Sequence, residues 1–376
     1  MINTLEFYKA LQPLVDFYTG VPDSLLKDFC AYLSDHLEDD RHIIAANEGN
    51  SIALAAGHYL ATGKPSLVYM QNSGIGNTVN PLLSLMDADV YGIPVLMLIG
   101  WRGEPGVKDE PQHVKQGKIT LSLLECMGID YALMDSSSDM KQILTEAEKH
   151  LRENLPFAIV VRKNTFSEYK LLSEKADLSD FPREEALKIL VNKSESADMF
   201  ISTTGKISRE LFEIREENNQ SHSTDFLIVG SMGHTSQIAA GVALAGKKRQ
   251  IICLDGDGSM LMHMGSLAVN GNLAMKNMIH LVLNNGAHDT VGGQPTVSKN
   301  MDLCAIATAC GYKKCLSCSS AEELEKALDS MRKEKVLTFI EVKVKKGARD
   351  NLGRPTISPV DCKNAFIKEM QSSVSQ

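Results

Sequence analysis

Short apolar runs rich in β-branched residues recur along the whole chain, and stretches with helical character lie between them. The runs are PSLVYM, IPVLMLIG, FAIVV, DMFIST, DFLIVG, IICLDG, IHLVLNN and LTFIEVKV. Strands that are apolar throughout are buried on both faces, and such strands joined by crossover helices are typical of parallel sheets. The pattern therefore predicts an α/β protein built on parallel strands.

A polar stretch interrupts this alternation near the middle of the chain. Between the strands expected at Phe157–Val161 and Asp198–Ser202, the sequence NTFSEYKLLSEKADLSDFPREEALK is charged and poor in strand formers. The 376 residues are enough for two domains of roughly 100–200 residues each. We therefore predict a first domain at 1–175 and a second domain at 185–376.

Charge and composition disfavour several classes of partner. The formal net charge of −8 argues against nucleic acid and anionic membranes, because both select broad basic surfaces. No apolar run approaches the roughly 18–20 residues of a membrane helix, and the start MINTLEFYKALQPL lacks the pattern of a secretory signal. We therefore expect a soluble, cytoplasmic protein. An anionic small substrate is compatible with this charge, because its site needs only a local cluster of cations and amides.

The eight cysteines are scattered singly, except that Cys315 and Cys318 form a CxxC pair. This thin usage suits reduced thiols rather than a disulfide framework. A zinc half-site with Cys304 or Cys310 is conceivable, but no second CxxC and no paired histidines follow. Ordinary thiols are therefore the favoured interpretation.

The most specific stretch is the glycine-rich acidic turn GDGS, which follows the expected strand IICLDG. Gly256 and Gly258 are expected to let the backbone turn tightly and approach a ligand. Asp257 and Ser259 supply oxygen ligands or hydrogen-bond donors. The turn is not a Rossmann dinucleotide motif, because GDGSMLMHMG does not match GxGxxG, and TTGKIS elsewhere in the chain is not a Walker motif.

A pair of asparagines, Asn284 and Asn285, ends the next expected strand. Crossover topology brings the carboxyl ends of adjacent parallel strands together, so Asp257 and the asparagine pair can converge on one ion. A carboxylate, an amide oxygen, a backbone carbonyl and phosphate oxygens form an all-oxygen shell that suits Mg²⁺. A diphosphate is the natural bridging ligand at such a site.

The order GDGS, helix and LNN resembles the cofactor motif of thiamine-diphosphate-dependent enzymes. The resemblance implies that Asp257, Asn285 and the main chain of Ala287 bind Mg²⁺, which anchors the diphosphate. GSMG at Gly230–Gly233 resembles the loop whose apolar residue, here Met232, props the cofactor into a bent conformer.

Further cofactor contacts follow from the same resemblance. Thr204 and Gly205 follow another strand of the second domain and are candidates for lining the pyrimidine or the diphosphate. The segment AANEGNSIALAAGHYLATGKP resembles the glutamate loop and following helix of the pyrimidine-binding domain, and Gly63 is expected to end that helix. From the residues alone, Glu48 is only a favourable charge at a helix N-terminus. The resemblance implies that it shares a proton with the cofactor's aminopyrimidine ring.

Two residues of the first domain are candidates for proton transfer. Asp23 in GVPDS resembles an active-site aspartate of 2-oxo acid decarboxylases, and His113 falls where such enzymes have a loop histidine. The resemblance implies that they relay protons after carbon dioxide has left. The loop Trp101–Lys118 contains several cations, and we expect it to bind an anionic headgroup together with the GGQPT turn. A solvated, mixed-charge surface is the equally weighted alternative for most of its side chains.

Over nearly the whole chain, NEGN, QNSGIGN, GWRGEPGVKDEPQH, STTGKISREL, GSMGH, GDGS and GGQPT occur in the order seen in the phosphonopyruvate decarboxylases. Similarity to that family implies two parallel-sheet thiamine-diphosphate-binding domains, one of pyrimidine type and one of diphosphate type, without a middle domain. It also implies a homo-oligomer of at least two chains with the active site at the subunit interface. The implied reaction is decarboxylation of phosphonopyruvate to phosphonoacetaldehyde and carbon dioxide.

Three alternative functions stay open at this point. The sister family, the sulfopyruvate decarboxylases, shares these motifs, although the fused two-domain length suits the phosphonate enzymes better. A noncatalytic thiamine-diphosphate-binding sensor could lose Glu48, which this chain has. A nicotinamide-dependent oxidoreductase would require a nucleotide motif that the sequence does not contain.

Overall fold

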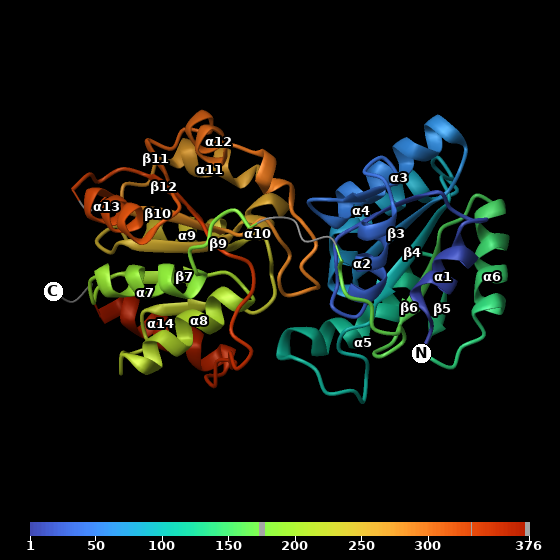
Figure 1. Ribbon diagram of the computed structural model, residues 1–376, viewed down its shortest axis with the longest axis horizontal. Helices are drawn as coiled ribbons and strands as arrows, with labels where there is room; N and C mark the ends of the chain where they lie inside the picture. Colours follow the sequence, from blue (N-terminus) through green and yellow to red (C-terminus); the bar gives the residue numbers. More distant parts are fainter. Residues whose placement is uncertain (173–176, 332, 373–376) are drawn as a thin grey trace. The chain divides into compact units, whose positions relative to one another are not determined.

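The structure of the chain is a computed structural model, which describes residues 1–172, 177–331 and 333–372. The chain divides into two compact units, Met1–Glu174 with Thr290–Gln294 and Lys175–Asp289 with Pro295–Gln376. Each unit is a six-stranded parallel sheet with helices on both faces (Figure 1). The predicted α/β fold class is confirmed. Residue 175, the predicted end of the first domain, lies outside the described residues.

The first unit has the strand order β2-β1-β3-β4-β6-β5. Its strands are β1 (Phe17–Gly20), β2 (His42–Ile44), β3 (Ser66–Gln71), β4 (Val95–Gly100), β5 (Asp130–Met134) and β6 (Phe157–Val161). Its helices are α1 (Thr4–Leu11), α2 (Lys27–His36), α3 (Glu48–Thr62), α4 (Ile75–Pro81), α5 (Pro111–Cys126) and α6 (Met140–Arg152). A 3₁₀ turn at Asn72–Gly74 and a π-helical turn at Leu82–Met86 flank α4.

Two apolar layers hold the helices of the first unit on its sheet. On one face, Phe7 of α1, Phe29 of α2 and Leu144 of α6 pack against the strands. On the other face, Ile52 of α3 and Leu124 of α5 do the same. Burial of each side chain of this size contributes roughly 1.5–3 kcal/mol. The strand ends, and the polar residues that directly follow them, are therefore held on a rigid base.

The second unit has the strand order β11-β12-β10-β9-β7-β8. Its strands are β7 (Met199–Ser202), β8 (Asp225–Leu227), β9 (Ile251–Gly256), β10 (Met278–Asn284), β11 (Lys314–Cys318) and β12 (Thr338–Lys343). Its helices are α7 (Arg183–Lys193), α8 (Lys206–Glu217), α9 (Thr235–Ala245), α10 (Asp257–Met262), α11 (Ser266–Leu273), α12 (Leu303–Ala309), α13 (Ala321–Met331) and α14 (Pro359–Ser372). A 3₁₀ turn lies at Val297–Asn300. Helices α7, α8 and α13 cover one face of this sheet, and α9, α11 and α12 cover the other.

Each of the eight apolar runs contains a strand, but four strands were not expected from the sequence. These are β1, β2, β5 and β11. Cys315 and Cys318 both lie on β11 as free thiols. In the described ranges, no helix has the length and apolar character needed to cross a membrane.

Candidate active site

The candidate residues of the first unit follow four neighbouring strands, β2, β1, β3 and β4. Glu48 follows β2, Asp23 follows β1, the segment Gln71–Asn77 starts at the end of β3, and Arg102 follows β4. The carboxyl ends of parallel strands meet at one edge of the sheet, where open α/β sheets bind ligands. The sheet order therefore gathers these side chains at one edge.

Glu48 is the first residue of α3 and is 6% exposed. The Asn47 side chain caps this helix by accepting a hydrogen bond of 2.9 Å from the Asn50 amide. Asn77 Nδ2 donates a hydrogen bond of 2.7 Å to Glu48 Oε2. The other carboxylate oxygen lies against Gly74, where a Cβ would come within 2.5 Å of Oε1. The segment QNSGIGN thus fixes the Glu48 carboxylate from two sides.

Asp23 is fully buried. Its Oδ2 accepts a hydrogen bond of 2.8 Å from the Leu25 amide, and within the described ranges its Oδ1 has no hydrogen-bond partner. A Cβ at Gly100 would collide with Oδ2, so the glycine that ends β4 leaves room for this carboxyl group. Burial raises the pKa of Asp23, because the charged form is poorly solvated there.

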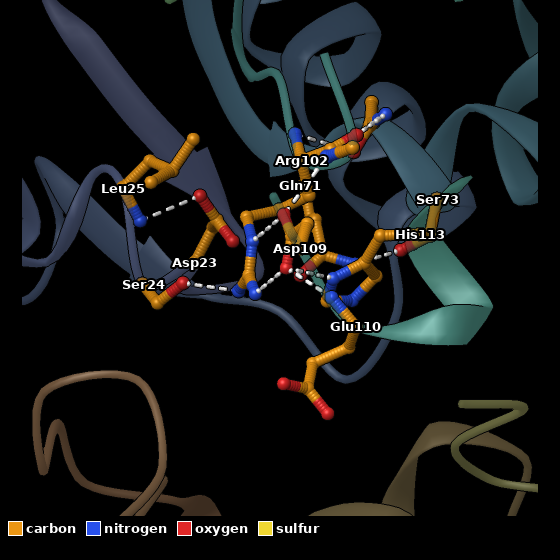
Figure 2. A network of polar contacts seen from close by, with 11 residues as sticks. Asp23, Ser24, Leu25, Gln71, Ser73, Arg102, Asp109, Glu110 and His113 are labelled. Atoms are coloured by element: carbon orange, nitrogen blue, oxygen red, sulfur yellow. Dashed lines mark hydrogen bonds and ion pairs between the residues drawn. The ribbon is translucent and has the colours of Figure 1, made fainter. Parts of the chain in front are cut away.

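Asp109 is the centre of a polar network on the loop after β4 (Figure 2). Its carboxylate accepts hydrogen bonds from Arg102 Nε at 2.8 Å and Arg102 Nη2 at 2.5 Å, a bidentate pair. The backbone amides of Gly103 and Glu110 add two more at 2.8 Å each. Burial alone would raise the pKa of Asp109, but the hydrogen bonds from Arg102, His113 and Gly103 outweigh it and lower this pKa. Asp109 is therefore an ionised carboxylate.

His113, on the first turn of α5, is 7% exposed and points toward Asp109 (Figure 2). Its Nδ1 lies 3.0 Å from Asp109 Oδ1. An ionised carboxylate can only accept, so Nδ1 carries the proton and Nε2 of the neutral ring is an acceptor. Burial lowers the pKa of His113, and Asp109 only partly opposes this effect.

In the described part of the first unit, the cationic side chains of this loop are either paired or exposed. Arg102 is paired with Asp109, and its Nη1 donates to Ser24 Oγ at 2.7 Å. Lys108, Lys115 and Lys118 are exposed. The expectation that this loop binds an anionic headgroup therefore gains no support from its side-chain contacts.

The candidate residues of the second unit also follow four neighbouring strands, β10, β9, β7 and β8. Thr204 and Gly205 follow β7, and Thr204 Oγ1 accepts a hydrogen bond of 3.2 Å from the amide of Gly230, which follows β8. Ser259 Oγ accepts hydrogen bonds of 3.1 Å from Thr203 Oγ1 and from the Gly233 amide. The three loops after β7, β8 and β9 are therefore tied together.

Helix α10 begins directly at Asp257, so the expected turn at GDGS is a strand-to-helix junction. The chain turns from β9 into α10 at Gly256, but the φ of −110° there is open to any residue, so this turn does not require glycine. Gly258 is needed for close packing instead. A Cβ there would lie 3.0 Å from His288 Cε1 and 3.5 Å from Cε of Met232, which reaches across this glycine.

Asp257 is 2% exposed and accepts hydrogen bonds from Thr296 Oγ1 and, at 2.9 Å, from Ser298 Oγ. Burial raises its pKa to about 6, although both hydroxyl groups oppose the rise. Across the described ranges, no cationic side chain forms an ion pair with Asp257. A buried carboxylate without a cation is costly, and a bound divalent ion would remove that cost.

The two asparagines differ in how their amide oxygens are used. Asn284 Nδ2 donates to Glu341 Oε1 at 2.8 Å, and its Oδ1 accepts from the Gly286 amide and Ser298 Oγ. Asn285 Oδ1 accepts one hydrogen bond, of 3.0 Å, from the amide of Ala287. An amide oxygen has two lone pairs, so, as far as the described residues show, Asn285 keeps one for another ligand and Asn284 does not.

The oxygen atoms available here are suitable ligands for Mg²⁺. The Asp257 carboxylate, the Asn285 amide oxygen and the Ala287 carbonyl are all hard oxygen ligands, which Mg²⁺ prefers over nitrogen and sulfur. Mg²⁺ commonly keeps further sites for water and phosphate oxygens. The residues present are therefore suited to hold a metal ion and, through it, a diphosphate.

Sequence reasoning missed the residues that hold these groups in place. Asn77 beside Glu48, Asp109 beside His113, and the hydroxyl pair Thr296 and Ser298 were not singled out. Asp109 stands four residues before His113, a spacing that places two side chains on the same face of a helix. The other contacts bridge segments far apart in the chain and leave no such local signal.

Two family models match the chain. The N-terminal thiamine pyrophosphate (TPP) binding domain of thiamine pyrophosphate enzymes matches residues 7–126, and the C-terminal TPP binding domain matches residues 203–342. The chain is 35% identical to a phosphonopyruvate decarboxylase of Streptomyces viridochromogenes, over 97% of this chain and 94% of the relative. It is 34% identical to the phosphonopyruvate decarboxylase of Streptomyces hygroscopicus, over 97% of this chain and 93% of that relative. A sulfopyruvate decarboxylase of Methanosarcina acetivorans is 28% identical to this chain, over 94% of this chain and 93% of that relative.

Proposed function

Since the chain belongs to the phosphonopyruvate decarboxylase family of thiamine pyrophosphate enzymes, we propose that it converts phosphonopyruvate to phosphonoacetaldehyde and carbon dioxide. The observation that carries the proposal is the buried Glu48 carboxylate, held by Asn77 at the start of α3. A protein that only binds the cofactor has no need of this group. The higher identity to the two phosphonate enzymes than to the sulfonate enzyme favours phosphonopyruvate as substrate.

Thiamine diphosphate, when bound, supplies the nucleophilic carbon and the electron sink for decarboxylation. Glu48 would hold the proton that the ring nitrogen of a bound aminopyrimidine needs, with its carboxylate held in place by Asn77. Met232 would support a bound cofactor, and Thr204, Gly205 and Gly230 would line the same site.

Mg²⁺ is proposed as the metal of this site, with the Asp257 carboxylate, Asn285 Oδ1 and the Ala287 carbonyl as its protein ligands. The burial of Asp257, and the lack of an ion-pair partner for it among the described residues, support this assignment. Gly256, Gly258 and Ser259 form the strand-to-helix junction beside the diphosphate. The Ser259 hydroxyl joins this junction to the loops after β7 and β8 by accepting hydrogen bonds from Thr203 and Gly233.

Asp23 and His113 are proposed to move the proton that the product carbon takes up. Burial shifts their pKa values in opposite directions, up for Asp23 and down for His113. The raised pKa lets Asp23 keep its proton to a higher pH, and the lowered pKa favours the neutral His113 ring with Nε2 as an acceptor, a division of roles typical of acid–base pairs. Asp109 acts through His113, because its hydrogen bond to Nδ1 leaves Nε2 as the working atom.

A homo-oligomer of at least two chains is part of the proposal. In it, each cofactor contacts Glu48 of one chain and Asp257 of another. The support is the resemblance to enzymes that build their cofactor site between subunits.

Sulfopyruvate decarboxylation is the second candidate, because a sulfopyruvate decarboxylase is 28% identical over 94% of the chain. Purified protein incubated with thiamine diphosphate, Mg²⁺ and phosphonopyruvate tests the main proposal. Phosphorus NMR should show phosphonoacetaldehyde in step with carbon dioxide release. Absence of this product with both cofactors present would contradict the proposal.

A further inference from the structure

The Asn285 side chain is held in one of its two amide orientations. Its Nδ2 donates a hydrogen bond of 2.8 Å to Asp289 Oδ2. An amide rotated by 180° would instead turn its oxygen toward that carboxylate, and two acceptors repel each other. Asp289, which binds Nδ2, and the Ala287 amide, which donates to Oδ1, therefore set the direction in which Asn285 Oδ1 points.

Asp289 is itself fixed by partners from distant parts of the second unit. Its Oδ2 also accepts hydrogen bonds from Arg183 Nη1 at 3.1 Å and from the Gly347 amide at 3.0 Å. Arg183 lies at the start of α7, and its Nη2 donates to the Gly347 carbonyl at 2.9 Å. One main-chain amide and one guanidinium, which is itself bound to the Gly347 carbonyl, thus leave Asp289 little freedom to move.

Glu210 of α8 completes the network from the other side of Arg183. Its two carboxylate oxygens accept hydrogen bonds of 2.8 Å each from Nε and Nη2, which is the bidentate geometry that fixes a guanidinium plane. Arg183 is 5% exposed and Glu210 is 2% exposed. A chain of contacts therefore runs from Glu210 through Arg183 and Asp289 to the amide of Asn285.

Stability alone is a poor explanation for this buried network. Desolvation of buried ion pairs offsets much of their attraction, and well-packed apolar residues of similar size are often equally stable in their place. What such a network supplies is a fixed orientation of the groups at its end. Residues behind a metal ligand commonly play this part.

We propose that Asp289 is a positioning residue of the metal site, which, with Arg183 and Glu210 behind it, turns Asn285 Oδ1 toward the ion. The inference rests on the proposed function only in taking Asn285 as a metal ligand. Asn284 offers the contrast, because its donor is bound by Glu341 and both lone pairs of its oxygen are in use.

The test is the Mg²⁺ dependence of thiamine diphosphate binding, measured by calorimetry on the full chain without substrate. Asp289→Ala should raise the Mg²⁺ concentration needed for half-maximal cofactor binding by about 10–100-fold. Asp289→Leu, which keeps the approximate size of the side chain and removes the acceptor, should show the same direction and guards against misfolding of the alanine variant. The double variant of Asp289→Ala and Asn285→Ala should bind Mg²⁺ no more weakly than Asn285→Ala alone, because Asp289 acts through Asn285.

Asp225→Asn is the matched control. Asp225 also forms a buried bidentate pair in the second unit, with Arg215 Nε and Nη2 at 3.0 Å each, but this pair does not touch Asn285. The control should lose stability toward urea and keep the Mg²⁺ dependence of the parent. The inference would be overturned if both Asp289 variants kept the Mg²⁺ dependence of the parent. It would also be overturned if the losses of Mg²⁺ affinity in Asp289→Ala and Asn285→Ala added in full in the double variant. Turnover of phosphonopyruvate in the parent would stand in either case, so the two proposals fail separately.

Discussion

The Asn77 amide donates a hydrogen bond of 2.7 Å to the Glu48 carboxylate, and this contact joins α4 to the first residue of α3. Gly74 closes the opposite side of the same carboxylate. Two residues of one short segment therefore determine where the Glu48 carboxylate lies. The geometry explains why an asparagine and a glycine stand three residues apart in QNSGIGN.

Gly74→Ala should impair turnover by displacing the Glu48 carboxylate, because the new Cβ would lie 2.5 Å from Oε1. A displacement of about 1 Å at a catalytic group can cost roughly 100-fold in rate. Steady-state kinetics and urea unfolding should show a large fall in kcat with a free energy of unfolding lower by only about 1–3 kcal/mol. Gly57→Ala in α3 is the control, because nothing lies within 4 Å of its Cβ position. It should keep full activity, and equal activity of the two variants would refute the proposed contact.

Glu48→Gln should bind thiamine diphosphate but lose about 10²–10⁴-fold in kcat, because an amide cannot share the ring proton. Asp257→Ala should abolish Mg²⁺-dependent cofactor binding.

When these two inactive variants, Glu48→Gln and Asp257→Ala, are mixed and allowed to exchange subunits, each mixed dimer should regain one intact site. About a quarter of the parent activity is expected for a dimer with statistical exchange. A mixture that stays inactive after demonstrated exchange would rule out a site shared between chains.

Asp109→Asn should lower kcat and shift the pH profile, because the neutral amide no longer holds His113 with Nδ1 protonated. Removing the carboxylate leaves the nearby Arg102 charge unopposed, so the pKa of His113 should fall further. The acid limb of kcat/KM that reports His113 should therefore move to lower pH. Asp130→Asn is the matched control, since it breaks another Asp–His hydrogen bond, 2.9 Å from His150, in the same unit. An identical effect of both substitutions would assign Asp109 a structural role only.

The sequence predicted the buried strands because their apolar runs leave few other interpretations. The four missed strands lack this signal. β5 and β11 are edge strands with largely half-exposed positions, so their sequences DYALM and KCLSC mix polar with apolar residues. β1 and β2 have only four and three residues, too few to show a period.

Site residues that lie in a motif of the family could be predicted from the sequence. The residues that hold their side chains in position could not. Glu48, Asp257 and Asn285 stand in recognisable segments. Asp289 and Arg183 are 106 residues apart and meet only because the fold brings the start of α7 to the loop after β10. Contacts of this kind depend on tertiary packing, which no local pattern encodes.

His42 should make the first unit less stable at acidic pH. Burial lowers its pKa from 6.5 to about 4, although the charge of Asp39 opposes this, and Nε2 lies 2.8 Å from the Tyr69 hydroxyl. The pKa of His42 is lower in the folded state than in the unfolded state. The contribution of neutral His42 to the free energy of unfolding is therefore complete above about pH 6.5 and is lost as the pH falls toward 4. Between pH 7 and pH 5 the loss should be about 2 kcal/mol. Urea unfolding at both pH values should show a smaller drop for His42→Gln than for the parent; equal drops would contradict this source of acid sensitivity.

The specificity constant for phosphonopyruvate, measured beside those for sulfopyruvate and pyruvate, tests the central claim most directly. All three acids should be assayed by carbon dioxide release with saturating thiamine diphosphate and Mg²⁺. Pyruvate lacks the charged headgroup and so forgoes the charge-assisted hydrogen bonds that a phosphonate accepts, and its kcat/KM should be lower by orders of magnitude. Sulfopyruvate keeps three headgroup oxygens with less charge and should be the stronger competitor. A kcat/KM highest for phosphonopyruvate is the predicted result, whereas a higher value for sulfopyruvate or pyruvate would contradict the proposed function.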